Sequence, residues 1–136
     1  MDELICVAFA GKLFGIDRDT GQLRWNVDFS EWSSPIVELQ LAAERAFAFT
    51  TQHFLIVNRR TGEVIKKVER KDETVGQRPM VLLDRDRFLI AAMGAVACYT
   101  VEGAFLWQQP FKGKGFGDMA IGVPGNIRQA DDRGSR

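Results

Sequence analysis

The chain has 136 residues, of which 46% are hydrophobic and 26% are charged, and its formal net charge at pH 7 is zero. This length suits a single domain. The zero net charge argues against a general nucleic-acid binder and against recruitment to anionic lipid, because no global field attracts either partner.

The first residues do not match a signal peptide, since their charges are acidic and the apolar run is brief. No apolar run approaches the length of a membrane span. We therefore expect a cytoplasmic protein with neither a membrane nor a nucleic acid as its partner. Cys6 and Cys98 lie in separate apolar runs and His53 is the only histidine, so we expect no disulfide, no metal site and no cofactor.

Short apolar segments separated by polar turns predict β-strands along most of the chain. Leu23, Trp25, Val27 and Phe29 alternate with polar residues, which places one face of their strand inward. The charged segment 69–78 predicts a loop or one helical turn. The expected strands are 4–10, 12–17 and 22–29 in a first unit, 34–39, 45–50, 53–58 and 63–69 in a second, 79–83, 87–92, 95–100 and 104–109 in a third, and 118–123 after it.

These units repeat with a constant period. Gly21, Gly62 and Gly103 stand at equal intervals, because 62 − 21 and 103 − 62 are both 41. Each glycine ends a polar hairpin turn, where it can adopt a positive φ without strain. Four short antiparallel strands in a unit of about 40–45 residues are the pattern of a β-propeller blade.

The first unit, GKLFGIDRDTGQLRW, resembles the repeat of pyrroloquinoline-quinone-like (PQQ-like) β-propellers. The positions that match are Gly11, Asp17, Thr20, Gly21 and Trp25 in the first unit, Thr61 and Gly62 in the second, and Gly94, Gly103 and Trp107 in the third. The later units depart from the pattern at Asn58, Lys66 and Glu102. The resemblance implies a propeller whose tryptophans dock between neighbouring blades, and it implies no single activity.

We predict an all-β chain with three four-stranded antiparallel propeller blades, at residues 1–29, 30–69 and 70–111. The first unit lacks its opening strand, so we expect 118–123 to supply a closing strand and 124–136 to form a C-terminal tail. Propellers usually have about four to eight blades, so three per chain predict a homodimer that forms one six-bladed β-propeller. In its simplest form, the C-terminal strand of each copy completes the first blade of the other.

Without such a partner, several apolar side chains at the two ends of the blade series would face water. They are Leu4, Val7, Phe9, Phe105 and Trp107. The alternative is that the sequence is a piece of a longer propeller. Met1 and the C-terminal run favour a complete chain.

Candidate binding residues come from the loops that precede inner strands, because such loops surround one mouth of a propeller channel. They are Trp32, Ser33, Arg78, Lys112 and Lys114. Lys112 and Lys114 belong to a glycine-rich segment, which either cradles an anion or is a flexible connection. Arg128 either pairs with a carboxylate or a partner chain, or belongs to a tail held against the dimer. We expect His53 at the surface.

The sequence contains no recognisable nucleophile with its base, no paired carboxylates and no metal-ligand cluster. We therefore expect a non-catalytic β-propeller module, a scaffold that self-associates and binds a protein or a small ligand at the channel mouth. The alternative is a quinone-dependent or other small-molecule enzyme that uses the same mouth.

Overall fold

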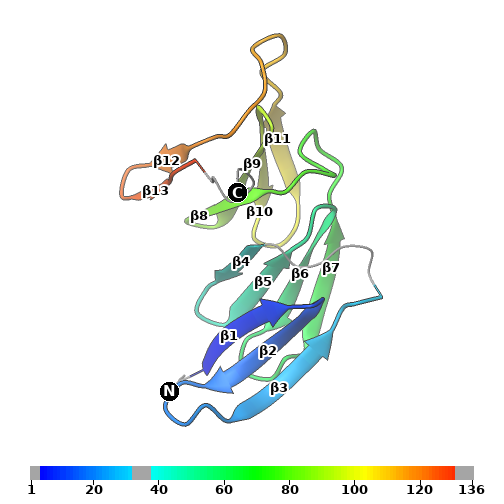
Figure 1. The fold of residues 1–136 in the computed structure, drawn as a ribbon, viewed down its shortest axis with the longest axis vertical. Helices are drawn as coiled ribbons and strands as arrows, with labels where there is room; N and C mark the ends of the chain where they lie inside the picture. The colour runs from blue at the N-terminus through cyan, green and yellow to red at the C-terminus, as the bar shows by residue number, and fades with distance from the viewer. Residues whose placement is uncertain (1–3, 32–37, 131–136) are drawn as a thin grey trace. The chain divides into compact units, whose positions relative to one another are not determined.

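The computed structural model describes residues 4–31 and 38–130, and it divides the chain into two compact units, Met1–Arg70 and Lys71–Arg136. Antiparallel strands joined by turns make up both units (Figure 1). Among the described residues, no helix is long and apolar enough to cross a membrane.

The first unit contains two antiparallel sheets. The first sheet has the order β1-β2-β3, with β1 at Leu4–Phe9, β2 at Lys12–Asp17 and β3 at Leu23–Asp28. The second sheet has the order β4-β5-β6-β7, with β4 at Glu38–Leu41, β5 at Arg45–Phe49, β6 at His53–Asn58 and β7 at Val64–Glu69. Each strand therefore pairs with the next one along the chain, as in a propeller blade.

The second unit contains a four-stranded sheet and a hairpin. This third sheet has the order β11-β10-β9-β8, with β8 at Met80–Asp84, β9 at Arg87–Ala92, β10 at Ala95–Thr100 and β11 at Phe105–Gln109. The hairpin pairs β12, at Ile121–Val123, with β13, at Asn126–Arg128.

The strands lie close to where the hydrophobic pattern predicts them. The first sheet has three strands within the described part of the chain, as expected for a unit that lacks its opening strand. Within the range 124–136, predicted as a tail, Asn126–Arg128 forms a strand and pairs with the predicted closing strand. Whether that closing strand also completes the first blade of another copy stays a prediction. Part of the predicted strand 34–39 lies outside the described residues.

The prediction for His53 is wrong, because this residue begins β6 and is buried, with 8% of its surface exposed. Its Nδ1 has no hydrogen-bond partner within the described residues. Burial lowers the pKa of His53 from its usual value of 6.5, and the nearby positive charge of Lys67 lowers it further.

The two sheets of the first unit share one hydrophobic core. Leu13 of β2, Trp25 of β3 and Phe29 just after β3 form what we call the front face of the first sheet, and they pack against the second sheet. The surface that they meet is the back face of the second sheet, formed by Ala46, Ala48, Leu55 and Val57, each 0% exposed.

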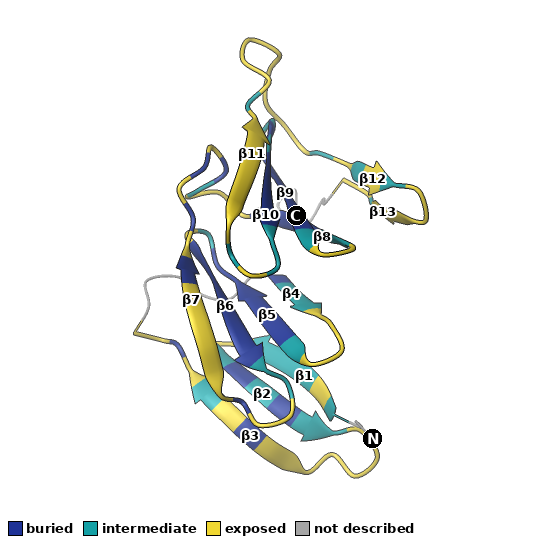
Figure 2. Cartoon of the chain, turned by 180° about the vertical axis from the view of Figure 1, so that it is seen from behind, coloured by how far each residue is buried: buried dark blue, intermediate teal, exposed yellow. Residues whose placement is uncertain are grey.

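Burial falls from the central strands toward the outer ones. Figure 2 shows β6 almost entirely buried, whereas β7 and β11 are largely exposed. A central strand has neighbours on both edges and both faces, and an outer strand has one free edge.

The third sheet has a smaller core of its own, in which Leu82, Leu89 and Cys98 are buried. Ile121 and Val123 of β12 pack against these residues, so the hairpin covers part of one face of the sheet. Burial raises the pKa of the Cys98 thiol, which makes the group a small hydrophobe instead of a reactive thiolate.

Candidate functional site

Two hairpin turns of the first unit have the same hydrogen-bonded geometry. In the first, Asp17 Oδ1 accepts the backbone N–H groups of Asp19 at 2.9 Å and Thr20 at 3.1 Å. In the second, Asn58 Oδ1 accepts the backbone N–H groups of Arg60 and Thr61 at the same distances. These bonds also lower the pKa of the Asp17 carboxyl, since backbone donors stabilise its charged form.

The threonine and the glycine complete both turns. Thr20 Oγ1 accepts the backbone N–H of Gln22, and Thr61 Oγ1 accepts that of Glu63, both at 3.2 Å. Gly21 and Gly62 follow with φ angles of 77° and 81°, a region that glycine adopts without steric cost. The motif Asp/Asn-x-x-Thr-Gly therefore specifies one turn shape, on local chemistry alone.

Trp25 connects the first sheet to the second of these turns. Its Nε1–H donates to the Arg59 carbonyl oxygen at 3.0 Å. A Cβ added to Gly62 would lie 2.7 Å from Cδ2 and Cε3 of the ring, so the indole lies directly against this glycine. On its own sheet the ring covers Gly15, the residue paired with it across β2 and β3. Trp25 therefore has a structural position between two sheets, where it is 9% exposed.

Trp107 occupies the equivalent place on the third sheet but is 44% exposed. Trp107 pairs with Cys98 across β10 and β11, just as Trp25 pairs with Gly15 across β2 and β3. In both sheets the strand register shifts directly after this pair. The turn at Gly103 is different, because the Gly103 N–H donates to the Thr100 carbonyl and Thr100 Oγ1 accepts from Ala104. The missing residue in this turn, visible in the sequence, explains the different shape.

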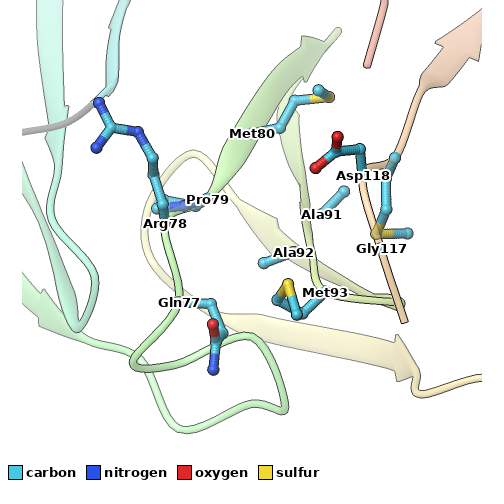
Figure 3. Close-up of a pocket in the computed structure, with 10 residues that line it drawn as sticks. Gln77, Arg78, Pro79, Met80, Ala91, Ala92, Met93, Gly117 and Asp118 are labelled. Carbon is cyan, nitrogen blue, oxygen red and sulfur yellow. The ribbon is translucent and has the colours of Figure 1, made fainter. Parts of the chain in front are cut away.

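A small pocket lies at the end of the third sheet where β8 begins and β9 ends. Its volume is about 170 Å³, and its lining includes Met80, Ala91 and Ala92. Figure 3 shows the Asp118 carboxylate at this pocket, whereas the Arg78 guanidinium points away from it. The pocket thus offers a mostly apolar surface with one acid, and Arg78 does not form an ion pair with that acid there.

The glycine-rich segment lies at the same end of the sheet. Lys112 lines one further hollow and Lys114 lines another. Phe116 lines both hollows and is 87% exposed. The segment approaches the β9–β10 turn so closely that a Cβ on Gly94 would lie 2.7 Å from the Gly115 carbonyl oxygen. Three of the predicted binding residues, Arg78, Lys112 and Lys114, thus lie at one end of the third sheet.

Arg128 lies elsewhere, at the free edge of β8. Its Nη1 donates to the Val81 carbonyl oxygen at 2.8 Å, and Asn126 Nδ2 donates to the Leu83 carbonyl oxygen at 3.1 Å. These side chains donate to carbonyls at the edge of β8, which protects the edge. Trp32 and Ser33, the two remaining candidates, lie outside the described residues.

Sequence reasoning missed a buried polar network before β8. Asp72 accepts hydrogen bonds from the Thr74 N–H at 2.7 Å and from the Thr74 hydroxyl. The Tyr99 hydroxyl donates to Asp72 Oδ2 at 2.7 Å and accepts the Lys71 N–H at 3.2 Å. The spacing of Asp72 and Thr74 is typical of a local polar turn, but nothing in the sequence pairs this turn with Tyr99. The network holds the loop that leads to the pocket.

The described residues contain no group of three or more histidine, cysteine or acidic side chains that could hold a metal ion. The candidate site therefore consists of an apolar pocket, a basic aromatic loop and a rigid polar support. These features suit noncovalent binding.

Solved structures with a similar arrangement of strands are β-propellers. BamB from Moraxella catarrhalis superposes with a TM-score of 0.59 at 21% identity, over 79% of this chain and 33% of that one. The Pan2 WD40 domain from Neurospora crassa gives 0.67 at 13% identity, over 82% and 36%. The quinohemoprotein alcohol dehydrogenase ADHIIG from Pseudomonas putida HK5 gives 0.60 at 12% identity, over 79% and 25%.

These likenesses define the class of fold, a PQQ-like β-propeller type built from antiparallel blades. The chain spans about a third of the length of BamB and of the Pan2 domain, and a quarter of the dehydrogenase. No protein-family model matches the sequence, and the search of curated proteins found no match.

Proposed function

We propose that this chain is a non-catalytic β-propeller scaffold that self-associates and binds a protein or a small ligand at one end of its blades. One observation supports self-association above all. Strand β11 is exposed along its whole length although it carries Phe105, Leu106 and Trp107, which are 50%, 41% and 44% exposed. Trp107 pairs with Cys98 and Phe105 pairs with Tyr99, so the two rings lie on opposite faces and the exposed apolar surface surrounds this outer strand. Exposed apolar surface of this kind marks an interaction site.

The ligand-binding surface is the end of the third sheet, where the pocket meets the glycine-rich segment. Lys112 and Lys114 supply positive charge beside the exposed ring of Phe116. An acidic peptide or a small anionic molecule with an apolar part would suit this combination. Cys6 and Cys98 remain thiols, which is compatible with a reducing compartment, and the proposal keeps the cytoplasm as the location.

The experiment that tests self-association is multi-angle light scattering of the full chain on a sizing column, over a wide range of concentrations. We expect the mass of a dimer, twice the chain mass of 15.3 kDa. A mass of one chain at every concentration would overturn the proposed self-association. The quinone-dependent alternative has no specific observation among the described residues in its favour.

A further inference from the structure

The contact between the first two sheets shows how neighbouring blades pack in this chain. The front face of the first sheet meets the back face of the second, and Trp25 covers the turn at Gly62. The back face of the second sheet is formed by Ala46, Ala48, Leu55 and Val57. The residues that precede these by one repeat period of 41 are, in the same order, Ile5, Val7, Phe14 and Ile16. The first sheet therefore has an equivalent back face, formed by these four residues.

Strand pairing confirms that the four residues share one side of the first sheet. Ile5 pairs with Ile16 and Val7 pairs with Phe14 across β1 and β2. Phe14 and Ile16 lie on the opposite side of β2 from Leu13, so they and their partners on β1 face away from the second sheet. Ile5 is 39% exposed and the other three are half-buried, in contrast to the fully buried alanines and their neighbours in the second sheet.

The third sheet repeats the front face. Successive cross-strand pairs place Leu82, Leu89, Cys98 and Trp107 in one row on one side of it. The β12–β13 hairpin covers the first three of these residues and leaves Trp107 exposed. Strand β12 has β13 as its partner on one edge, so within the described residues its second edge carries unpaired backbone groups. The hairpin thus resembles the beginning of a further blade.

Among the described residues, the turn at Gly21 is of the kind that Trp25 covers, but no ring lies on it. Gly62 is buried under the indole, whereas a Cβ added to Gly21 would have nothing within 4 Å. The two turns share the same set of hydrogen bonds, including the one from the glycine N–H to the Asp17 or Asn58 carbonyl at 2.9 and 2.8 Å. The exposed tryptophan and the open turn are therefore complementary halves of a contact that the first unit already shows.

We propose that the front face of the third sheet in one copy of this chain covers the back face of the first sheet in a second copy. Trp107 packs against Gly21 of that copy and donates its Nε1–H to the Arg18 carbonyl, as Trp25 does at Arg59. Strand β12 pairs with β1 of the same copy and so supplies the missing strand. This interface rests on the self-association proposed above.

A second copy is the occupant because the ring must close. Three blades are fewer than the roughly four needed for a propeller, whereas two chains provide six. Each copy offers one front face and one back face, so two identical contacts related by a two-fold axis leave neither face uncovered. In this arrangement the contact between copies uses a tryptophan, a glycine turn and two sheet faces, as the contact between the first two sheets does.

Two single substitutions test the interface from its two sides. Trp107→Ala removes the ring, and Gly21→Asn adds a side chain that tolerates positive φ but fills the space for the ring. We expect each to weaken dimerisation by about thirtyfold or more, measured by light scattering on dilution, because buried tryptophans dominate interfaces. Circular dichroism of each variant checks that it folds.

Two control variants make the same kinds of substitution at positions outside the proposed contact. Phe116→Ala removes another exposed ring, and Gly76→Asn places asparagine at a φ of 90° where a Cβ would also have nothing within 4 Å. Both controls should dimerise as the unchanged chain does. If they weaken the dimer as much as Trp107→Ala and Gly21→Asn do, the proposed contact is wrong.

Mixing the two interface variants distinguishes this geometry from any other dimer. A homodimer of Trp107→Ala or of Gly21→Asn has both contacts broken, whereas a mixed dimer retains one intact contact, between the Trp107 of the second variant and the Gly21 of the first. We therefore expect the mixture to dimerise more strongly than either variant alone and more weakly than the unchanged chain.

The outcomes separate the two proposals. A dimer that neither substitution weakens, or a mixture no stronger than its components, would overturn this interface and leave self-association standing. A chain that is monomeric at every concentration would overturn self-association itself. Assemblies that grow beyond two copies on concentration would refute the closed two-fold arrangement.

Discussion

Substitution of Gly62 by alanine would measure how strongly Trp25 holds the first two sheets together. Gly62 and Gly21 have φ angles of 81° and 77°, so alanine meets similar backbone strain at both positions, about 1–2 kcal/mol. Only at Gly62 would the new Cβ meet a ring, 2.7 Å from Cδ2 and Cε3 of Trp25. The difference between the two variants therefore isolates the contact of the indole with the turn.

The size of this difference follows from the crowding. The ring is 9% exposed and is held by its hydrogen bond to the Arg59 carbonyl, so it cannot move aside without loss. Overfilling a packed core costs about 1–3 kcal/mol. We expect Gly62→Ala to lower the free energy of unfolding of the first unit by this amount more than Gly21→Ala does.

Both variants should be made in a Trp107→Ala background, which removes any ring that a second copy would place on Gly21. The remaining tryptophans, Trp25 and Trp32, both belong to the first unit, so their fluorescence during urea denaturation reports that unit. Equal losses of stability for Gly62→Ala and Gly21→Ala would refute the view that Trp25 packs against the second turn.

Three further predictions concern His53, Asn58 and Arg128. The pKa of buried His53 is lowered, so the free energy of unfolding should fall as the pH drops below about 6.5 toward the folded-state pKa, and His53→Gln should remove this fall. Asn58→Ala should lower the free energy of unfolding by about 1–2 kcal/mol, because two backbone donors lose their acceptor. Arg128→Ala should speed amide hydrogen exchange in the β12–β13 hairpin, since it loses the bond to Val81.

Each of these has a control and a result that would contradict it. His53 is the only histidine, so an unchanged pH dependence in His53→Gln would show that other groups cause it. Asn58→Asp should retain most of the stability, and a loss equal to that of Asn58→Ala would disprove the role of the side-chain oxygen. Ile127 is 63% exposed, so exchange in Ile127→Ala should stay slow; faster exchange in both variants would contradict the role assigned to Arg128.

The strand positions and the shape of the turns follow from local chemistry and were predictable. Alternating apolar residues indicate a strand because successive side chains point to opposite faces. The motif from Asp17 to Gly21 specifies its own hydrogen bonds, and its near copy from Asn58 to Gly62 forms the same ones. The period between these turns was enough to indicate a propeller type of fold.

The candidate site was predicted less well, because its parts meet through packing. Lys112, Lys114 and Arg78 lie at one end of the third sheet, and their place at the mouth of a propeller channel stays a prediction. No pattern revealed that Arg128 would bond the edge of β8, nor that Asp72 would lie under Tyr99. These contacts join residues about 27 to 47 positions apart, beyond the range of local propensity.

By itself, the sequence determined which segments become strands, which turns join them and that the unit recurs, since these depend on neighbouring residues. Only the tertiary structure decided which tryptophan is covered. Trp25 and Trp107 both stand four residues after a turn glycine, yet one is 9% and the other 44% exposed. The difference arises because a second sheet packs over the first residue, whereas no neighbouring sheet among the described residues covers the second to the same extent.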